Sequence, residues 1–221
     1  MKILASTAVS AAAAVLFSAV AAAGNPLELP RLPSNDVDAR PLQAGGTFQA
    51  TAFPLALRIT TPDGSWLGGQ GKIATQKRGT FGWVEFLQRP AARPLGAISM
   101  IGSYDPTPSV AATVAQLRTG VGATFQATRP ARLAGFSGSQ FDGQVTGKHH
   151  VFVPFSPVTH AATFHPDAYR FDAGEVFRIV VLSVRGRTVV LLLENVALPA
   201  DQFPAFLDSA GKLLGSLRFP A

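Results

Sequence analysis

Apolar residues recur along the chain in patterns that predict β-strands. In residues 53–59 they alternate with polar or small residues, which is the two-residue period of a strand with one buried face. The two strongest segments, 176–184 and 188–194, are apolar at consecutive positions, so we expect strands buried on both faces. Because only Arg185, Gly186 and Arg187 separate them, they should form a hairpin. Shorter strand candidates lie at 72–76, 80–87, 97–103, 124–128, 140–145 and 151–155.

Two segments instead have the 3.6-residue period of an amphipathic helix. The first follows Asp105, with Thr107 placed as the N-cap, Pro108 at the first helical position and Gly120 beyond the end. The second runs from Asp201 to about Leu217. An apolar sheet needs cover on both faces, so the sequence predicts an α+β fold in which an antiparallel β-sheet is sandwiched between helices, an α/β/α arrangement.

The N-terminal segment has the organisation of an export signal. Lys2 precedes an apolar stretch that ends on three alanines, as in a cleavable signal peptide over residues 1–23. The alternative is an uncleaved membrane anchor, because the stretch is almost long enough to span a bilayer. Residues 24–46 contain four prolines and no apolar period, which predicts a flexible arm, and residues 47–221 then form a single α/β domain. We therefore expect a secreted or extracytoplasmic protein with no transmembrane segment in the mature chain.

Composition excludes several classes of protein. Hydrophobic residues make up 47% of the 221 residues and charged residues 14%, which predicts a packed core rather than a disordered chain. The chain has no cysteine, so disulfides, thiolate metal sites, a cysteine nucleophile and a lipid-anchoring N-terminal cysteine are all excluded.

The order of elements resembles the Mog1/PsbP-like family, which includes exported bacterial proteins of the LpqN type. The resemblance rests on the strand at 53–59 with its turn at 61–64, on Asp105-Pro106 before the middle helix, on the stretch 129–142, and on the apolar hairpin and closing helix to Phe219. It implies an antiparallel sheet between helical layers and a non-catalytic binding or scaffolding role. The lack of a cysteine departs from the lipoprotein members and favours free secretion.

The net charge of +6 is concentrated in the first half of the domain, where residues 53–141 hold nine cations and three anions. Basic and aromatic residues occur together there, and this cluster is our predicted partner-binding region: Lys72, Lys77, Arg78, Trp83, Arg89 and Arg93. Such a cluster fits an envelope protein or an anionic surface component. The alternative is a solvated sheet face. Nucleic acid is not expected, because the chain has an export signal and no recognisable nucleic-acid motif.

Histidines provide the weak candidates for a metal site. The candidate ligands are His150, His160, His165 and Asp167, but their spacing matches no metal-binding motif. His149 and His150 are adjacent, so in a strand they would point to opposite faces. Surface histidines are therefore the simpler interpretation, and we expect no metal or other cofactor.

The sequence contains no catalytic signature that would identify an enzyme. The segment 135–139 has the wrong glycine spacing for a serine nucleophile turn. We therefore expect a non-enzymatic binding or scaffolding module at the cell envelope. The alternative is a metal-dependent or hydrolytic enzyme that uses the histidine region. A third possibility is a solute-binding or structural role for the apolar interior between sheet and helix, which requires a pocket of a few hundred Å³.

Overall fold

A computed structural model of the chain describes residues 29–32, 39–75, 79–88, 96–119, 121–152, 154–155, 169–196 and 198–221. The predicted signal peptide lies outside these residues. The strands are β1 (Arg40–Pro41), β2 (Thr47–Ala50), β3 (Leu57–Thr60), β4 (Trp66–Thr75), β5 (Gly79–Gln88), β6 (Gly96–Ser103), β7 (Ala123–Phe125), β8 (Arg129–Leu133), β9 (Phe136–Val145), β10 (His149–Phe152), β11 (Tyr169–Asp172), β12 (Val176–Val184) and β13 (Arg187–Glu194). The helices are α1 (Val110–Leu117), the 3₁₀ helix η1 (Ala200–Gln202) and α2 (Phe203–Gly215).

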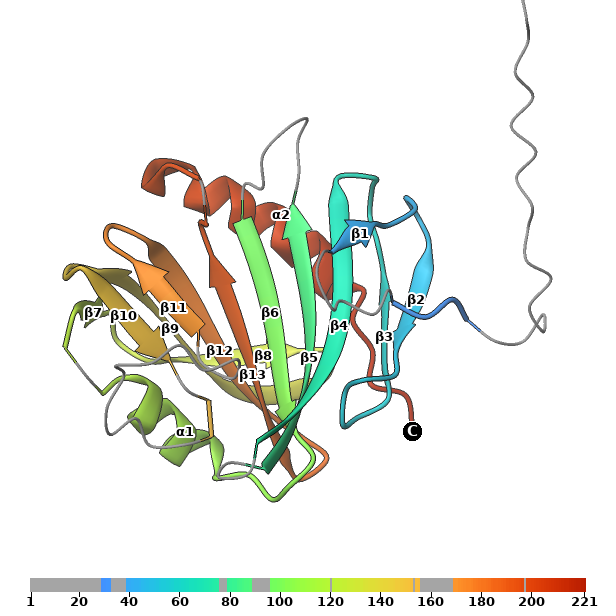
Figure 1. Cartoon of the computed structure of the whole chain (residues 1–221), viewed down its shortest axis with the longest axis horizontal. Helices are drawn as coiled ribbons and strands as arrows, with labels where there is room; N and C mark the ends of the chain where they lie inside the picture. Colours follow the sequence, from blue (N-terminus) through green and yellow to red (C-terminus); the bar gives the residue numbers. More distant parts are fainter. Residues whose placement is uncertain are drawn as a thin grey trace, which may run out of the picture.

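Nine of the described strands form one antiparallel sheet (Figure 1). Eight of them follow the order β1-β4-β5-β6-β13-β12-β9-β7, and β8 pairs with the first half of β9. The predicted hairpin is confirmed and lies inside the sheet, where β12 and β13 are paired from Phe177↔Glu194 to Val184↔Arg187. Its turn places Gly186 at φ 77°, a conformation that glycine adopts without steric cost.

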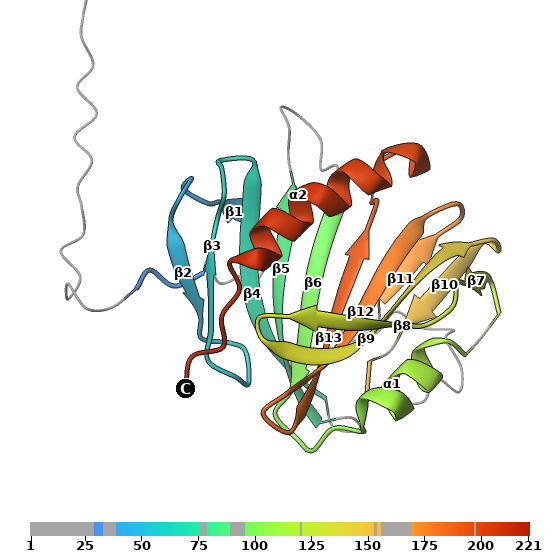
Figure 2. The same ribbon diagram turned by 180° about the vertical axis from the view of Figure 1, so that it is seen from behind.

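Both faces of the sheet are apolar, and different elements of the chain cover each face. Val180, Leu182 and Val184 of β12 belong to the core beneath α2, which lies across one face (Figure 2). The alternating residues Ile179 and Val181 point to the opposite face. There the core is completed by α1 and by the β10–β11 hairpin, through the buried side chains of Val114, Leu117, Phe152 and Phe171.

The predicted α/β/α sandwich is therefore wrong. The described residues form mainly antiparallel β-structure, and the large sheet does not lie between helical layers. The reason is length: α1 has 8 residues and is about 12 Å long, whereas the eight strands that lie side by side at about 4.8 Å spacing span roughly 34 Å. Aromatic side chains of the β10–β11 hairpin bury much of the surface that a second helical layer would have covered.

Both ends of the described chain are held against the domain. In the predicted flexible arm, Leu32 and Leu42 are buried in the core and β1 pairs with β4, so these parts pack rather than extend. At the other end, backbone hydrogen bonds join Arg58 and Arg218 in both directions at 2.9 Å. The Ser216 hydroxyl accepts from the Thr60 N–H and donates to the Thr60 carbonyl.

The first helix begins later than predicted. Ser109, not Thr107, is its N-cap, and the Ser109 hydroxyl accepts a hydrogen bond from the Ala112 N–H. The Thr107 hydroxyl instead accepts from the Thr188 N–H at 2.8 Å. The residue expected to cap the helix therefore joins the preceding loop to β13.

The backbone of Ala52, in the segment before β3, lies very close to Gly82 of β5, and a substitution can test this packing. A Cβ atom at Gly82 would collide with the carbonyl oxygen of Ala52, a backbone atom with little freedom to move. We expect Gly82→Ala to lower the free energy of unfolding by about 1–3 kcal/mol, as overpacking of a close contact does. Urea unfolding of Gly64→Ala is the control, because no atom lies within 4 Å of a Cβ there. Equal effects of the two substitutions would contradict this packing.

Candidate functional site

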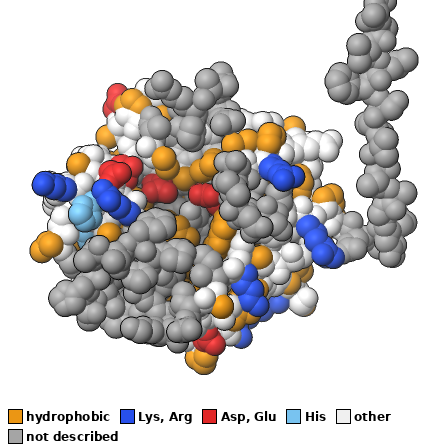
Figure 3. Space-filling model, viewed as in Figure 1, with side chains coloured by type: hydrophobic (Ala, Val, Ile, Leu, Met, Phe, Trp, Pro, Cys, Tyr) orange, Lys and Arg blue, Asp and Glu red, His pale blue; other side chains and the backbone are white. Residues whose placement is uncertain are grey.

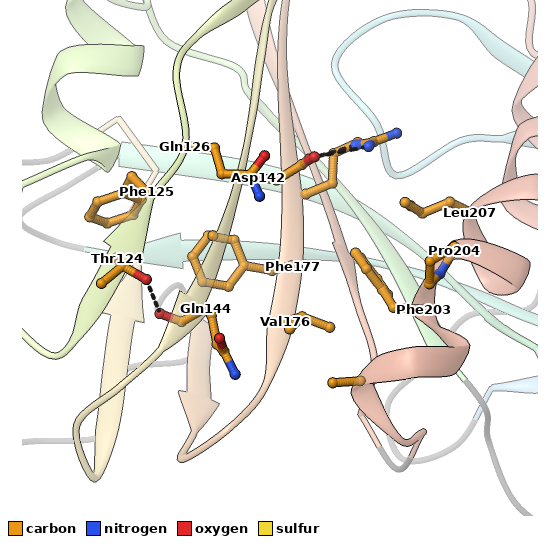
Figure 4. Close-up of a pocket in the computed structure, with 13 residues that line it drawn as sticks. Thr124, Phe125, Gln126, Asp142, Gln144, Val176, Phe177, Phe203, Pro204 and Leu207 are labelled. Carbon is orange, nitrogen blue, oxygen red and sulfur yellow. Dashed lines mark hydrogen bonds and ion pairs between the residues drawn. The ribbon is translucent and has the colours of Figure 1, made fainter.

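A groove of about 470 Å³ lies between the outer strands of the sheet and the N-terminal part of α2 (Figure 4). Its walls come from β7, β9 and β12 on one side and from η1 and α2 on the other. The lining residues are Thr124, Phe125, Gln126, Asp142, Gly143, Gln144, Val176, Phe177, Arg178, Ala200, Phe203, Pro204 and Leu207. A groove of this volume is within the range of small-molecule sites.

The strand register brings the polar side chains of the groove together. Asp142 pairs with Arg178 across β9 and β12, and Gln144 pairs with Val176 two residues further along. Because side chains alternate along a strand, these residues share the face that α2 covers further along the sheet. Thr124 of β7 lies opposite Gln144. The sheet wall of the groove is therefore mostly polar.

Helix α2 supplies the apolar wall. Phe203 and Leu207 are four residues apart and so lie on the same side of the helix. Phe203 is buried and Leu207 is half-buried, and both point toward the strands in Figure 4. Val176 adds apolar surface from β12, whereas the fully buried Phe177 ring belongs to the core on the opposite face of the sheet. The groove thus has a polar side and an apolar side.

A compact ionic group occupies the polar side. The Arg178 Nε and Nη2 atoms donate to the two carboxylate oxygens of Asp142, at 2.6 and 3.0 Å, and the Arg129 Nη2 atom donates to Oδ2 at 2.7 Å. Burial alone would raise the pKa of Asp142, but the hydrogen bonds and charges of Arg178 and Arg129 outweigh it, so the pKa falls below its ordinary value. Asp142 is thus ionised at neutral pH.

The candidate metal ligands are not brought together by the described residues. His150 is buried, with its ring centroid 4.4 Å from that of Phe152 and its Nδ1 atom 3.1 Å from the Val121 carbonyl oxygen. Burial lowers the pKa of His150, which favours the neutral ring. His149 is exposed, so the predicted opposite orientation of the two histidines is confirmed. His160, His165 and Asp167 lie outside the described residues, and the part that is described contains no group of three potential metal ligands.

The structure places only two residues of the predicted basic cluster. Lys72 is exposed, with its Nζ atom 4.2 Å from the centroid of the Tyr104 ring, a cation–π contact. Trp83 is half-buried on β5 and covers Gly71 of β4. Lys77, Arg78, Arg89 and Arg93 lie outside the described residues, so this predicted surface stays a prediction. No helix in the described part of the chain has the length and apolar character needed to cross a membrane.

Acidic residues gather on the sheet face turned away from α2 (Figure 3). Glu85 and Glu194 lie there, because their strand neighbours Val84 and Leu193 belong to the core beneath α2. Burial, together with the negative charges of Glu175 and Glu85, raises the pKa of Glu194 to about 8. Burial also raises the pKa of Glu85 and Glu175.

Sequence reasoning predicted none of the groove residues individually. It did foresee that a pocket of a few hundred Å³ could lie between sheet and helix, and a groove of that size is present. A signal was available in the segment 176–184, where Arg178 is the single charged residue in a mainly apolar run. A charged residue in a strand expected to be buried on both faces indicates a charged partner or a ligand site.

Comparison with known proteins gives little further guidance. No protein-family model and no curated protein sequence matches the chain. A solved structure of LpqN, described as involved in cell envelope biogenesis of Mycobacterium tuberculosis, is similar over 84% of this chain and 93% of that chain, with 14% sequence identity and a TM-score of 0.33. This is a distant likeness, so membership of the Mog1/PsbP-like family stays a prediction.

Proposed function

We propose that the protein is an exported, non-enzymatic binding module of the cell envelope that holds a small amphipathic molecule in the groove between the sheet and α2. The observation that carries this proposal is the two-sided character of the groove. Phe203 and Leu207 offer an apolar wall, while Gln126 and Gln144 offer amide donors and acceptors opposite it. Small-molecule sites combine apolar surface with a few placed polar groups in this way.

The volume of the groove sets the size of the ligand. A water molecule in the liquid takes up about 30 Å³, so 470 Å³ corresponds to roughly 16 such volumes. A ligand with on the order of 16 non-hydrogen atoms would therefore fill the groove. This is the size of a small organic molecule.

The exported and non-enzymatic parts of the proposal rest on the sequence. Residues 1–23 have the features of a signal peptide, and the chain contains no recognisable catalytic motif. Among the described lining residues there is one carboxylate, Asp142, and both of its oxygens already accept hydrogen bonds from arginines. A general base needs a free acceptor near the substrate, so this arrangement favours binding over catalysis.

Binding of a neutral fluorescent probe tests the groove. N-phenyl-1-naphthylamine is apolar, uncharged and of suitable size, and its fluorescence rises when it leaves water. We expect the mature chain to bind it, and Leu207→Trp to weaken binding at least tenfold because the larger ring fills the apolar wall. Fluorescence titration measures both dissociation constants.

The control for this experiment is Ala205→Trp on the same helix. Ala205 is exposed and does not line the groove, so the added ring changes the surface without filling the site. Circular dichroism establishes that both variants are folded. If Ala205→Trp weakens binding as much as Leu207→Trp does, or if the unaltered chain does not bind the probe, the groove is not the binding site.

A further inference from the structure

The charges around the groove define the class of ligand more closely. Among the described lining residues, Asp142 is the only acid and Arg178 the only base. Arg129 stands just outside the lining and also binds Asp142, so two guanidinium groups surround one carboxylate. Because Asp142 is ionised and the arginines are always charged, the group carries a net charge of +1. The polar side of the groove is therefore electropositive.

Arg178 retains hydrogen-bonding capacity for a ligand. Its Nε and Nη2 atoms are occupied by Asp142, whereas Nη1 has no hydrogen-bond partner among the described residues. The two-point contact with Asp142 fixes the plane of the guanidinium group, which lowers the entropy lost when a further acceptor binds. Asp142 is thus a positioning residue, and Arg178 is the group that meets the ligand.

The apolar wall lies across the groove from this cation. Leu207 and Phe203 come from α2, and Arg178 comes from β12, so a bound molecule would contact both elements at once. We propose that the ligand is an organic anion, with its carboxylate, sulfonate or phosphate group bound by Arg178 and its apolar body packed against α2. This inference rests on the proposed function, because it assigns a ligand class to the same groove.

Two probes that differ only in one charged group distinguish the contribution of the anionic group to binding from that of the apolar body. 1-Anilinonaphthalene-8-sulfonate has the same ring skeleton as N-phenyl-1-naphthylamine and adds one sulfonate group. We expect the unaltered mature chain to bind the sulfonate probe at least tenfold more tightly than the neutral probe. Raising the salt concentration from about 50 mM to about 500 mM should weaken binding of the sulfonate probe and leave the neutral probe unaffected, because salt screens charge interactions.

Substitution of Arg178 identifies the group responsible. Arg178→Gln should weaken binding of the sulfonate probe at least tenfold and change binding of the neutral probe less than twofold. Arg178→Lys keeps the charge without the planar fork, so an intermediate loss is expected. Arg132→Gln is the control for net charge, since Arg132 is exposed on β8 and does not line the groove.

The outcomes distinguish this inference from the proposed function. Equal affinity of the unaltered chain for the two probes would overturn the organic-anion assignment and leave the binding function standing. Equal loss of both probes in Arg178→Gln would also overturn it, because Arg178 would then only support the shape of the groove. Loss of sulfonate binding in Arg132→Gln would show that net charge, and not Arg178, attracts the anion. Absence of binding by either probe would instead contradict the proposed function itself.

Discussion

Replacing Glu194 with glutamine should raise the free energy of unfolding at about pH 9 by several kcal/mol and leave it almost unchanged below about pH 4. The pKa of Glu194 is about 8 in the folded protein, against an ordinary value of 4.5. At about 1.4 kcal/mol per pKa unit, this difference corresponds to at most about 5 kcal/mol. Glu194→Gln removes that cost, because an amide carries no charge that burial or neighbouring carboxylates can oppose.

The direction of the pH dependence follows from proton binding. Between pH 4.5 and about 8, Glu194 is protonated in the folded chain and ionised in the unfolded chain. The folded state then binds more protons, so its stability falls as the pH rises through this interval. Below pH 4.5 both states are protonated and the contribution is constant. The raised pKa values of Glu85 and Glu175 act in the same direction.

Urea unfolding across this pH range measures the effect. The unaltered chain should lose stability from about pH 5 to pH 8, and Glu194→Gln should have a flatter profile. Asp208→Asn is the control, because Asp208 is exposed on α2, which covers the opposite face of the sheet from Glu194. Profiles of the same slope for the unaltered chain and Glu194→Gln would mean that Glu194 ionises normally in the folded protein.

Phe177→Ala should lower the free energy of unfolding by about 3–5 kcal/mol, the usual cost of removing a buried phenylalanine ring. Phe177 is fully buried, and its ring centroid lies 5.1 Å from that of Phe152, 5.2 Å from Phe171 and 6.1 Å from Phe125. The substitution therefore leaves a cavity where β12, the β10–β11 hairpin and β7 meet.

Two further variants make this prediction specific. Phe177→Leu retains most of the apolar volume and should cost clearly less than the alanine substitution. Phe48→Ala removes a ring that is only half-buried, so its cost should also be smaller. A loss of less than about 1 kcal/mol for Phe177→Ala, measured by urea unfolding, would place the aromatic cluster outside the cooperative core.

Local patterns predicted the centre of the sheet well. The runs that became β12 and β13 are apolar at almost every position because both faces of these strands are buried, and the short turn at Gly186 left a hairpin as the simple connection. β8 was missed because its five residues include Pro130 and two arginines, so the pattern resembles a loop. Its pairing with β9 is a local hairpin through the two-residue turn at Ala134 and Gly135, which both have positive φ.

Local patterns could not predict which elements cover the sheet, and they could not predict the groove. Periodicity identified both helices, but it did not indicate that α1 would be too short to cover a face or that β10 and β11 would pack beside it. The groove depends on the distance between α2 and β9, which are separated by more than 50 residues in the sequence. Only the register of β9 and β12 brings Asp142 to Arg178.

The bonds that join Arg58 to Arg218 and Thr60 to Ser216 also constrain the order of folding. They connect an early strand to the last few residues across a separation of 156 residues or more. Contacts this remote close late, because a long loop must be ordered first. Strand β3 therefore completes its hydrogen bonds only once residues 216–218 are available to pair with it.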